Sequence, residues 1–504
     1  MRIAYFLDSA KNLGGAGNTL LGQAKIMSSI HDVIVVIPRD KNGDTNSEYR
    51  SRCKRLDLRS VELTYITTFC IQNIDVIKAW YASEEIKRFA VKEKIEFFHS
   101  VQLNIGVELA ARELGIPHLM NIYQLRREEF VVKSMDLLPQ YHSCDSELYC
   151  RIWKEETGVD TCCVRVVAPL MSIQKKKREQ KECLNILMLG GVYERKNQLT
   201  AIKAVEAYNR GSSRVILTIA GLDTSEYAKE CREYVRKNQL QDCILMIGFQ
   251  SDVVSLLRKN DCLLCASTDE SFPSVIVEAL TYDLTVISTP VAGVPELLKD
   301  RENAYISRGY EENDILDSIK NCFYDYKSGD VWKLHDQAGV MWAKNFSADI
   351  VLKKLDEYYS NILRKHKIKR KLLNKENLKF RIMHIYKKMH NIIDRYPEVL
   401  ERCYYYSYLD TVLDDGNVCI WGAGKYGSIA KELLEIMFPK MRILAYIDIK
   451  KAGTYHEIPI IHPRDIKTED TDYIFIAFQS GRENVVNYLC RRDWRYNENV
   501  WIFP

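Results

Sequence analysis

The stretch Asp261-Cys-Leu-Leu-Cys-Ala266, followed by Glu270-Ser-Phe-Pro-Ser-Val-Ile-Val-Glu278, predicts a buried strand, a short loop and a helix. Pro273 suits the first position of that helix, because its missing N–H costs nothing there. The two glutamates are eight positions apart, so the first lies in the loop and the second projects from the second helical turn. Such a pair can hold two parts of one elongated polar ligand, although many glutamates at this spacing are simply solvated.

Three other segments place glycines or cations directly after a predicted strand. In Leu187-Met-Leu-Gly-Gly191-Val-Tyr-Glu-Arg195-Lys196-Asn197, a glycine pair and a charged turn lead into a helix. In Thr289-Pro-Val-Ala-Gly293-Val294-Pro295-Glu296, a glycine turn precedes a helix start, where free N–H groups favour phosphate. The third, Leu13-Gly14-Gly15-Ala16-Gly17, lets the backbone approach a ligand closely. All four segments follow strand ends, where α/β sheets bind their ligands.

In their order along the chain, these four segments resemble those of retaining family-4 glycosyltransferases, and the resemblance covers roughly residues 1–363. In that family the two glutamates bind a nucleotide sugar, a lysine meets the donor diphosphate, and glycine turns face the phosphates. The sequence departs from the pattern at two places. Gly191 stands where the family usually has an arginine, and Tyr123 stands where many members have a histidine.

The resemblance implies a retaining hexosyl- or related glycosyltransferase. It would move a sugar from a UDP- or GDP-linked donor to a saccharide, lipid-linked or protein acceptor in cell-surface polysaccharide biosynthesis. The reaction would need no metal and no other cofactor, since a lysine and backbone amides can neutralise the leaving diphosphate. By the same resemblance the catalytic residues are Lys196 and Glu270, with Glu270 on the donor sugar and Glu278 on the ribose. The implied donor-binding residues are Gly15, Arg195, Lys196, Phe272, Pro273, Glu278, Gly293 and Val294.

Polar residues after strands of the N-terminal half are candidates for binding the acceptor. His99 follows one predicted strand, and Tyr123 and Arg126 follow another. Arg126 suits an anionic acceptor such as a lipid phosphate, whereas a solvated loop with acidic counter-charges is the alternative. For His99 the alternative is a hydrogen-bonded residue at the end of a buried strand.

The alternation of strands and helices predicts two facing Rossmann-like α/β domains, the GT-B fold, plus a small Rossmann-like α/β domain. We expect an acceptor-side domain over residues 1–173 and a donor-binding domain with a returning helix over 174–363. The lysine-rich Gln174 to Lys181 is interpreted as the linker between them. A basic helical linker over 364–415 and the small domain over 416–504 complete a chain long enough for about three domains.

The small domain opens with Val418-Cys-Ile-Trp-Gly422-Ala-Gly424-Lys-Tyr-Gly427, and its second predicted strand ends at Asp448. This spacing matches the dinucleotide-binding fingerprint, which makes Gly422, Gly424, Gly427 and Asp448 candidate nucleotide-binding residues. The domain is shorter than a full six-stranded dinucleotide fold requires. Two alternatives to the transferase therefore stay open: a nucleotide-binding oxidoreductase or sensor, and an inactive glycosyltransferase-like binding subunit.

Composition favours a cytoplasmic protein. No apolar run is long enough to span a bilayer, and the chain opens on a predicted strand instead of a signal peptide. The net charge of +4 is small, and no nucleic-acid partner is expected. Residues 364–390 hold eleven Lys or Arg against one Glu. An amphipathic helix there would contact the inner face of a membrane, while a plain interdomain helix is the alternative.

Overall fold

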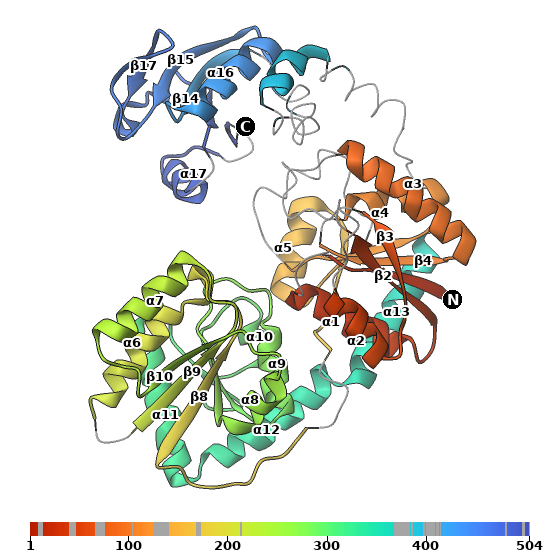
Figure 1. Cartoon of the computed structure of the whole chain (residues 1–504), viewed down its shortest axis with the longest axis vertical. Helices are drawn as coiled ribbons and strands as arrows, with labels where there is room; N and C mark the ends of the chain where they lie inside the picture. The colour runs from red at the N-terminus through yellow and green to blue at the C-terminus, as the bar shows by residue number, and fades with distance from the viewer. Residues whose placement is uncertain are drawn as a thin grey trace.

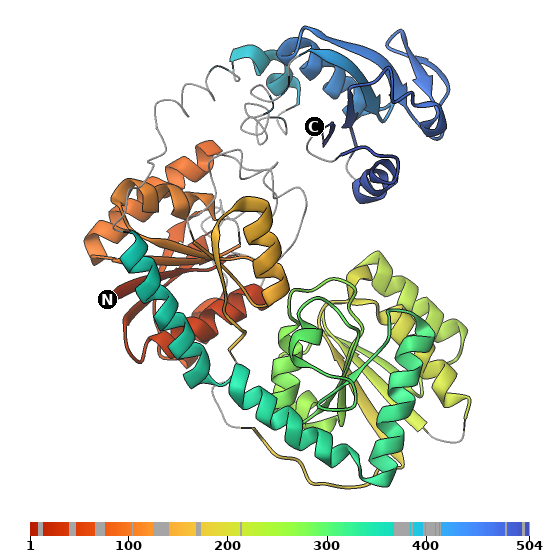
Figure 2. The same cartoon turned by 180° about the vertical axis from the view of Figure 1, so that it is seen from behind.

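The computed structural model describes residues 1–8, 14–39, 47–65, 76–102, 104–123, 141–167, 173–211, 214–366, 384, 387–396, 399, 409, 413, 415–478, 481–495 and 499–502. These residues form three sheets, built almost entirely from parallel strands and flanked by helices (Figures 1 and 2). The predicted α/β class, with two larger Rossmann-like domains and a third C-terminal sheet, is confirmed.

The first domain contains a seven-stranded parallel sheet of order β3-β2-β1-β4-β5-β6-β7. Its central strands are buried on both faces because helices cover both sides, whereas the edge strands β3 and β7 are partly exposed. Neither edge strand was predicted, since each mixes polar with apolar residues. The elements are β1 (Arg2–Phe6), α1 (Gly15–Met27), β2 (Asp32–Arg39), α2 (Ser47–Arg55), β3 (Arg59–Thr64), α3 (Val76–Glu93), β4 (Phe97–Val101), α4 (Ile105–Leu114), β5 (His118–Asn121), β6 (Tyr141–Cys144), α5 (Glu147–Thr157) and β7 (Asp160–Cys163).

The second domain contains a six-stranded parallel sheet of order β10-β9-β8-β11-β12-β13. The chain adds strands on one side of β8 up to β10 and then on the other side from β11 onward. The loops after β8 and β11 therefore lie at the topological switch point, where α/β folds bind ligands. The elements are β8 (Cys183–Leu189), the 3₁₀ turn η3 (Glu194–Lys196), α6 (Gln198–Asn209), β9 (Arg214–Ala220), α7 (Glu226–Lys237), β10 (Ile244–Gly248), α8 (Val253–Lys259), β11 (Cys262–Cys265), α9 (Ser274–Thr281), β12 (Thr285–Ser288), α10 (Val294–Leu297), β13 (Tyr305–Ile306), α11 (Glu312–Ser328) and α12 (Val331–Asn345).

Helix α13 (Ala348–His366) leaves the second domain and packs on the first, as Figure 2 shows. Its buried Tyr359 hydroxyl lies 2.6 Å from the Tyr5 hydroxyl. The neighbouring Tyr358 hydroxyl donates a hydrogen bond of 3.0 Å to the carbonyl of His142. The returning helix is therefore part of the first domain's core and ties the two domains together.

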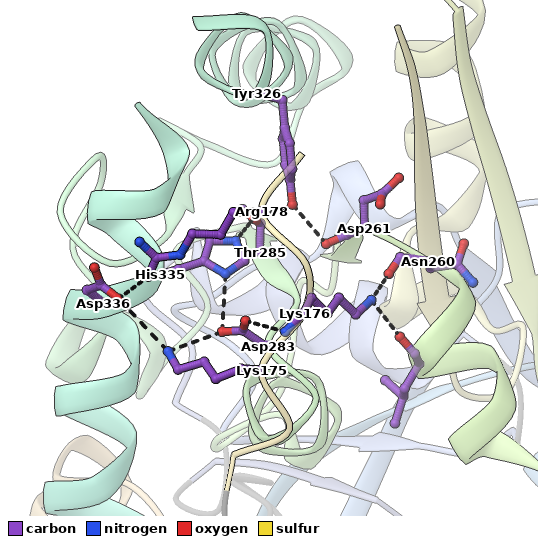
Figure 3. A network of polar contacts seen from close by, with 11 residues as sticks. Lys175, Lys176, Arg178, Asn260, Asp261, Asp283, Thr285, Tyr326, His335 and Asp336 are labelled. Carbon is purple, nitrogen blue, oxygen red and sulfur yellow. Dashed lines mark hydrogen bonds and ion pairs between the residues drawn. The ribbon is translucent and has the colours of Figure 1, made fainter. Parts of the chain in front are cut away.

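The lysine-rich segment 174–181, interpreted from the sequence as the linker between the two domains, is held to the second domain by polar contacts. Figure 3 shows that it lies against the second domain. The Lys176 N–H donates a hydrogen bond of 2.9 Å to Asp283 Oδ2, and the Arg178 guanidinium pairs with Asp336. Sequence alone shows the cations but not their distant carboxylate partners, so the segment's attachment could not be foreseen.

The third sheet has six strands in the order β16-β17-β15-β14-β18-β19, and only β16 runs antiparallel. No helix in the described part of the chain has the length and apolar composition needed to cross a bilayer. Most of the basic stretch 364–390 lies outside the described residues. The elements of this third unit are β14 (Gly416–Trp421), α16 (Lys425–Met437), β15 (Met441–Ile447), β16 (Gly453–Tyr455), β17 (Ile458–Ile461), β18 (Tyr473–Ile476), α17 (Arg482–Cys490) and β19 (Val500–Ile502).

Candidate active site

Two cations from the turn after β8 converge on one carboxylate from the loop after β11. Arg195 Nη1 lies 2.6 Å from Glu270 Oε1, and the Lys196 ammonium pairs with the same oxygen. The Thr268 N–H also donates a hydrogen bond of 2.8 Å to the carbonyl of Arg195, which ties the two loops together. The fold thus assembles a compact charged group from segments that are 75 positions apart.

The glycine at position 191 has a structural cause. A Cβ added there would lie 2.3 Å from the ring of Tyr193, so that ring fills the space where a side chain would begin. An arginine at this position would have to displace Tyr193. Arg195, which reaches the same carboxylate oxygen as Lys196, supplies the second cation of the site instead.

Glu278 projects from the second turn of α9, as predicted, and is partly buried. Its carboxylate has no hydrogen bond or ion pair with any other described residue. Burial raises the pKa of Glu278 to about 7, and the nearby Arg52 guanidinium opposes that rise. Because Arg52 belongs to α2 of the first domain, Glu278 faces across the interface between the domains.

The starts of two helices from different domains also face each other. A Cβ added to Gly15, the first residue of α1, would lie 3.7 Å from the hydroxyl of Ser274, the first residue of α9. Neither helix has an acidic residue in its first turn or a side-chain cap. Both positive helix ends therefore favour an anion, such as a diphosphate, at the junction of the domains.

The glycine turn before α10 is arranged differently from the expectation. The Gly293 N–H donates a hydrogen bond of 2.9 Å to Ser271 O, and the Val294 N–H donates one of 2.9 Å to Val291 O. A Cβ on Gly293 would lie 2.5 Å from Cβ of Ser146 in the first domain. Neither amide is open to a phosphate, so this geometry does not support a donor-binding role for Gly293 and Val294. The glycine allows close packing between the domains.

Phe272 and Pro273 shape the loop that carries Glu270. Phe272 is buried, with its ring centroid 5.4 Å from that of Phe346, so it packs in the core and is not open to a donor. Pro273 caps α9, and the helix proper begins at Ser274, one residue later than predicted. Their contribution is to fix the path of the loop.

His99 does not reach the interface between the domains. Its Nδ1 lies 2.6 Å from the Tyr359 hydroxyl and its Nε2 lies 2.7 Å from Asn121 Oδ1. Burial lowers the pKa of His99 to about 3, so the ring is neutral. This geometry supports the structural alternative for His99 over a role in acceptor binding.

The other two candidates for acceptor binding are Tyr123 and Arg126, and the structure describes only Tyr123. The hydroxyl of Tyr123 is buried, and burial raises its pKa, so this geometry gives no support for contact with an acceptor. Arg126 lies outside the described residues.

Sequence reasoning missed Asp8, at the end of β1 beside the start of α1. Asp8 is buried, its Oδ1 accepts a hydrogen bond of 2.9 Å from the Tyr49 hydroxyl, and burial raises its pKa. A Cβ on Gly17 would lie 1.9 Å from that hydroxyl, so the pair requires glycine there. A single acidic residue after a strand, next to a glycine-rich loop, was the signal that could have found it.

The glycine loop of the third unit has the predicted shape. Gly422 has φ +122°, and a Cβ there would lie 2.8 Å from the carbonyl of Ala477. A Cβ on Gly427 would lie 2.0 Å from the carbonyl of Gly422, whereas one on Gly424 would meet no atom within 4 Å. The first and third glycines are thus needed for packing, and only the second faces open space.

The carboxylate of Asp448 already accepts hydrogen bonds from backbone groups of its own unit. Its Oδ2 accepts a hydrogen bond of 3.2 Å from the Ala423 N–H, and its Oδ1 accepts bonds of 2.8 and 3.1 Å from the N–H groups of Lys450 and Lys451. The Lys451 ammonium donates back to the Ala423 carbonyl. The carboxylate that the fingerprint reserves for a ribose therefore holds the glycine loop to the end of β15.

Comparison with known proteins agrees with this geometry. Residues 172–334 match the family model for glycosyl transferases group 1. N-acetyl-alpha-D-glucosaminyl L-malate synthase of Bacillus anthracis is 24% identical over 139 residues, which are 27% of this chain and 35% of that protein. UDP-Gal:alpha-D-GlcNAc-diphosphoundecaprenol alpha-1,3-galactosyltransferase of Escherichia coli is 24% identical over 293 residues, 52% of this chain and 74% of that protein. The chain thus spans about a third of the first relative and about three quarters of the second.

Solved structures share the fold of the first two domains. Anabaena Alr3699/HepE, in complex with UDP and glucose, superposes with a TM-score of 0.58 at 15% identity and covers 71% of this chain and 99% of its own. A glycosyltransferase from Rickettsia africae superposes with a TM-score of 0.58 at 16% identity and covers 72% and 98%. The family match is confined to residues 172–334, and these structures show that the first two domains share the GT-B fold.

Proposed function

We propose that this protein is a retaining glycosyltransferase that moves a sugar from a nucleoside-diphosphate donor to a hydroxyl group of its acceptor. The observation that carries this proposal is the convergence of Arg195 and Lys196 on Glu270. Close by in the chain, α9 begins opposite Gly15 and carries Glu278, whose carboxylate is unpartnered within the described residues. The site therefore offers cations and helix ends to phosphates, and carboxylates to sugar hydroxyls.

The donor would rearrange the charges of the empty site. A diphosphate between the two helix starts would draw Lys196 and Arg195 away from Glu270, and the freed carboxylate would accept hydrogen bonds from the donor sugar. Glu278 would accept hydrogen bonds from the ribose. As the bond between the anomeric carbon and the diphosphate breaks, Lys196 would stabilise the charge that grows on the leaving oxygen. The acceptor oxygen would bond to the same carbon on the face that the diphosphate leaves, and the proton of the acceptor hydroxyl would pass to the departing diphosphate.

The nature of the two substrates is proposed from the relatives. The Escherichia coli relative is named for a UDP-linked sugar donor and a diphosphoundecaprenol acceptor, and Anabaena Alr3699/HepE was solved with UDP and glucose. We propose a UDP-linked donor and a glycan or lipid-linked acceptor for this chain. A lipid-linked acceptor would place the protein at a membrane surface, where the basic stretch 364–390 would add contact with anionic lipids.

A screen of UDP- and GDP-linked sugars for enzyme-dependent release of nucleoside diphosphate tests the proposal. We expect release with at least one donor, and we expect the α-anomeric donor linkage to be kept in the product, measured by proton NMR. Lys196→Ala serves as the negative control. A protein that releases nothing with any donor, and whose melting temperature responds to NAD and not to UDP or GDP, would contradict the proposal. The engagement of Asp448 by backbone amides favours the transferase over that nucleotide-binding alternative.

A further inference from the structure

The loop that carries Glu270 is held on both sides by the first domain. Before Glu270, Asp269 Oδ1 accepts a hydrogen bond of 3.1 Å from the hydroxyl of Tyr149, in the first turn of α5. After Glu270, the hydroxyl of Ser271 donates to the carboxylate of Asp145 and lies 3.1 Å from the hydroxyl of Ser146. Glu270 thus stands between two anchor points that belong to the other domain.

The second domain holds the start of α5 in return. Glu296 Oε1 accepts a hydrogen bond of 2.8 Å from the N–H of Leu148, and its Oε2 accepts one of 3.0 Å from the N–H of Glu147. The guanidinium of Arg165 adds a bond of 2.7 Å to the same carboxylate. A carboxylate at the positive end of a helix is a favourable electrostatic contact, so the position of α5 is fixed from across the interface.

The contacts of Ser271 with Asp145 and Ser146 are shielded from water, whereas Asp269 is exposed. Ser146 and Ser271 are 0% and 2% exposed, and Asp145 is 5% exposed. Hydrogen bonds in such surroundings are stronger than at the surface, and breaking them leaves buried polar groups without partners. The two domains therefore cannot separate at this point without releasing the residues on either side of Glu270.

We propose that Tyr149 and the Asp145–Ser271 pair are positioning residues that act through Glu270, so that the first domain sets the place of the carboxylate that contacts the donor sugar. This inference rests on the proposed function and specifies how the site is organised. Glu270 is correctly placed only while α5 is docked. The domain expected to bind the acceptor thereby controls the contact with the sugar, while the ribose contact of Glu278, inside α9, does not depend on the anchors.

Tyr149→Phe is the most selective test, because it removes one hydroxyl and keeps the ring. Tyr234→Phe is the matched control, since its hydroxyl donates a hydrogen bond of 2.7 Å to Glu206 within the second domain. With the UDP-sugar that the wild type turns over, we expect Tyr149→Phe to lower kcat about tenfold, the effect of one hydrogen bond to a charged group. The Kd of UDP alone, from calorimetry, should stay within twofold of wild type.

Hydrogen–deuterium exchange of the peptide over residues 267–273 gives a readout that does not depend on turnover. We expect faster exchange in Tyr149→Phe and in Ser271→Ala, with no change in Tyr234→Phe. Unchanged exchange in both interface variants, or an equal loss of kcat in Tyr234→Phe, would overturn the inference. If the wild type released no nucleoside diphosphate from any donor, the proposed function itself would fail, so the two failures are distinguishable.

Discussion

The donor-side site and the glycine loop of the third unit are built from similar parts and differ in whether their carboxylate is free. Both place a glycine turn after a parallel strand and an acidic residue nearby. In the second domain, Glu278 has no side-chain partner within the described residues, and its pKa is raised to about 7. In the third unit, Asp448 accepts hydrogen bonds from Ala423, Lys450 and Lys451.

This difference shows how a sequence motif can be distinguished from a binding site. A buried carboxylate without a partner costs folding free energy, and a ligand that supplies hydrogen bonds recovers that cost. A carboxylate that already binds three backbone N–H groups has little to gain from a ligand. Glu278 therefore fits a binding residue, whereas Asp448 fits a structural brace of its loop.

The largest expected effect is that of Lys196→Ala. Because negative charge on the leaving diphosphate grows in the transition state, we expect kcat to fall by about 10²–10³ while the Kd of UDP changes much less. Steady-state kinetics and calorimetry measure the two quantities. Lys229→Ala is the matched control, because this lysine lies in the same domain and, among the described residues, pairs only with the exposed Glu226. If turnover of Lys196→Ala stayed within a few-fold of wild type, Lys196 would not be the group that stabilises the leaving diphosphate.

The next largest effect is that of Glu278→Ala on nucleotide binding. Loss of a hydrogen bond to a charged group costs about 1.5–3 kcal/mol, so the Kd of UDP should rise roughly ten- to hundredfold. Asp448→Ala should leave the Kd of UDP unchanged. Equal Kd values for wild type and Glu278→Ala would show that the free carboxylate of the second domain does not bind the ribose.

Asp448→Ala tests whether the carboxylate of the third unit has a structural role. Because its carboxylate holds three N–H groups, we expect the third unit to lose about 1–3 kcal/mol of unfolding free energy. Differential scanning calorimetry should show an earlier transition for this unit, with turnover of the UDP-sugar unchanged. NAD should not shift the melting temperature of the wild type. A clear stabilisation by NAD that Asp448→Ala abolishes would instead make Asp448 a ribose ligand.

The smallest effect is a pH dependence of stability that comes from Glu278. Its folded pKa of about 7 lies above the ordinary 4.5, so the folded state binds the extra proton and stability falls as pH rises through that window. Glu278→Gln cannot ionise. The melting temperature of this variant relative to wild type should therefore rise by a few degrees from pH 5 to pH 8. The other buried acids, Asp8 and Asp145, are present in both proteins and cancel. A constant difference across this range would show that burial does not perturb Glu278.

Much of the fold was predictable because it depends on local patterns. Buried parallel strands such as β1 and β11 are almost wholly apolar. The edge strands β3 and β7 were missed, since their partial exposure allows polar residues. The contacts that hold the Gln174 to Lys181 segment to the second domain were not predicted, because the partners Asp283 and Asp336 lie about a hundred positions or more away.

By itself, the sequence determined the α/β class, the order of the loops of the candidate site, and the presence of Lys196, Glu270 and Glu278 among them, because apolar strand runs and glycine turns are local properties. Only the tertiary structure decided which of these groups are free. It assigned His99 to the core and Gly293 to the contact between domains, and it brought Asp145 and Tyr149 against the Glu270 loop. Hydrogen-bond partners and burial depend on residues far apart in the chain, and those are what separate a binding carboxylate from a structural one.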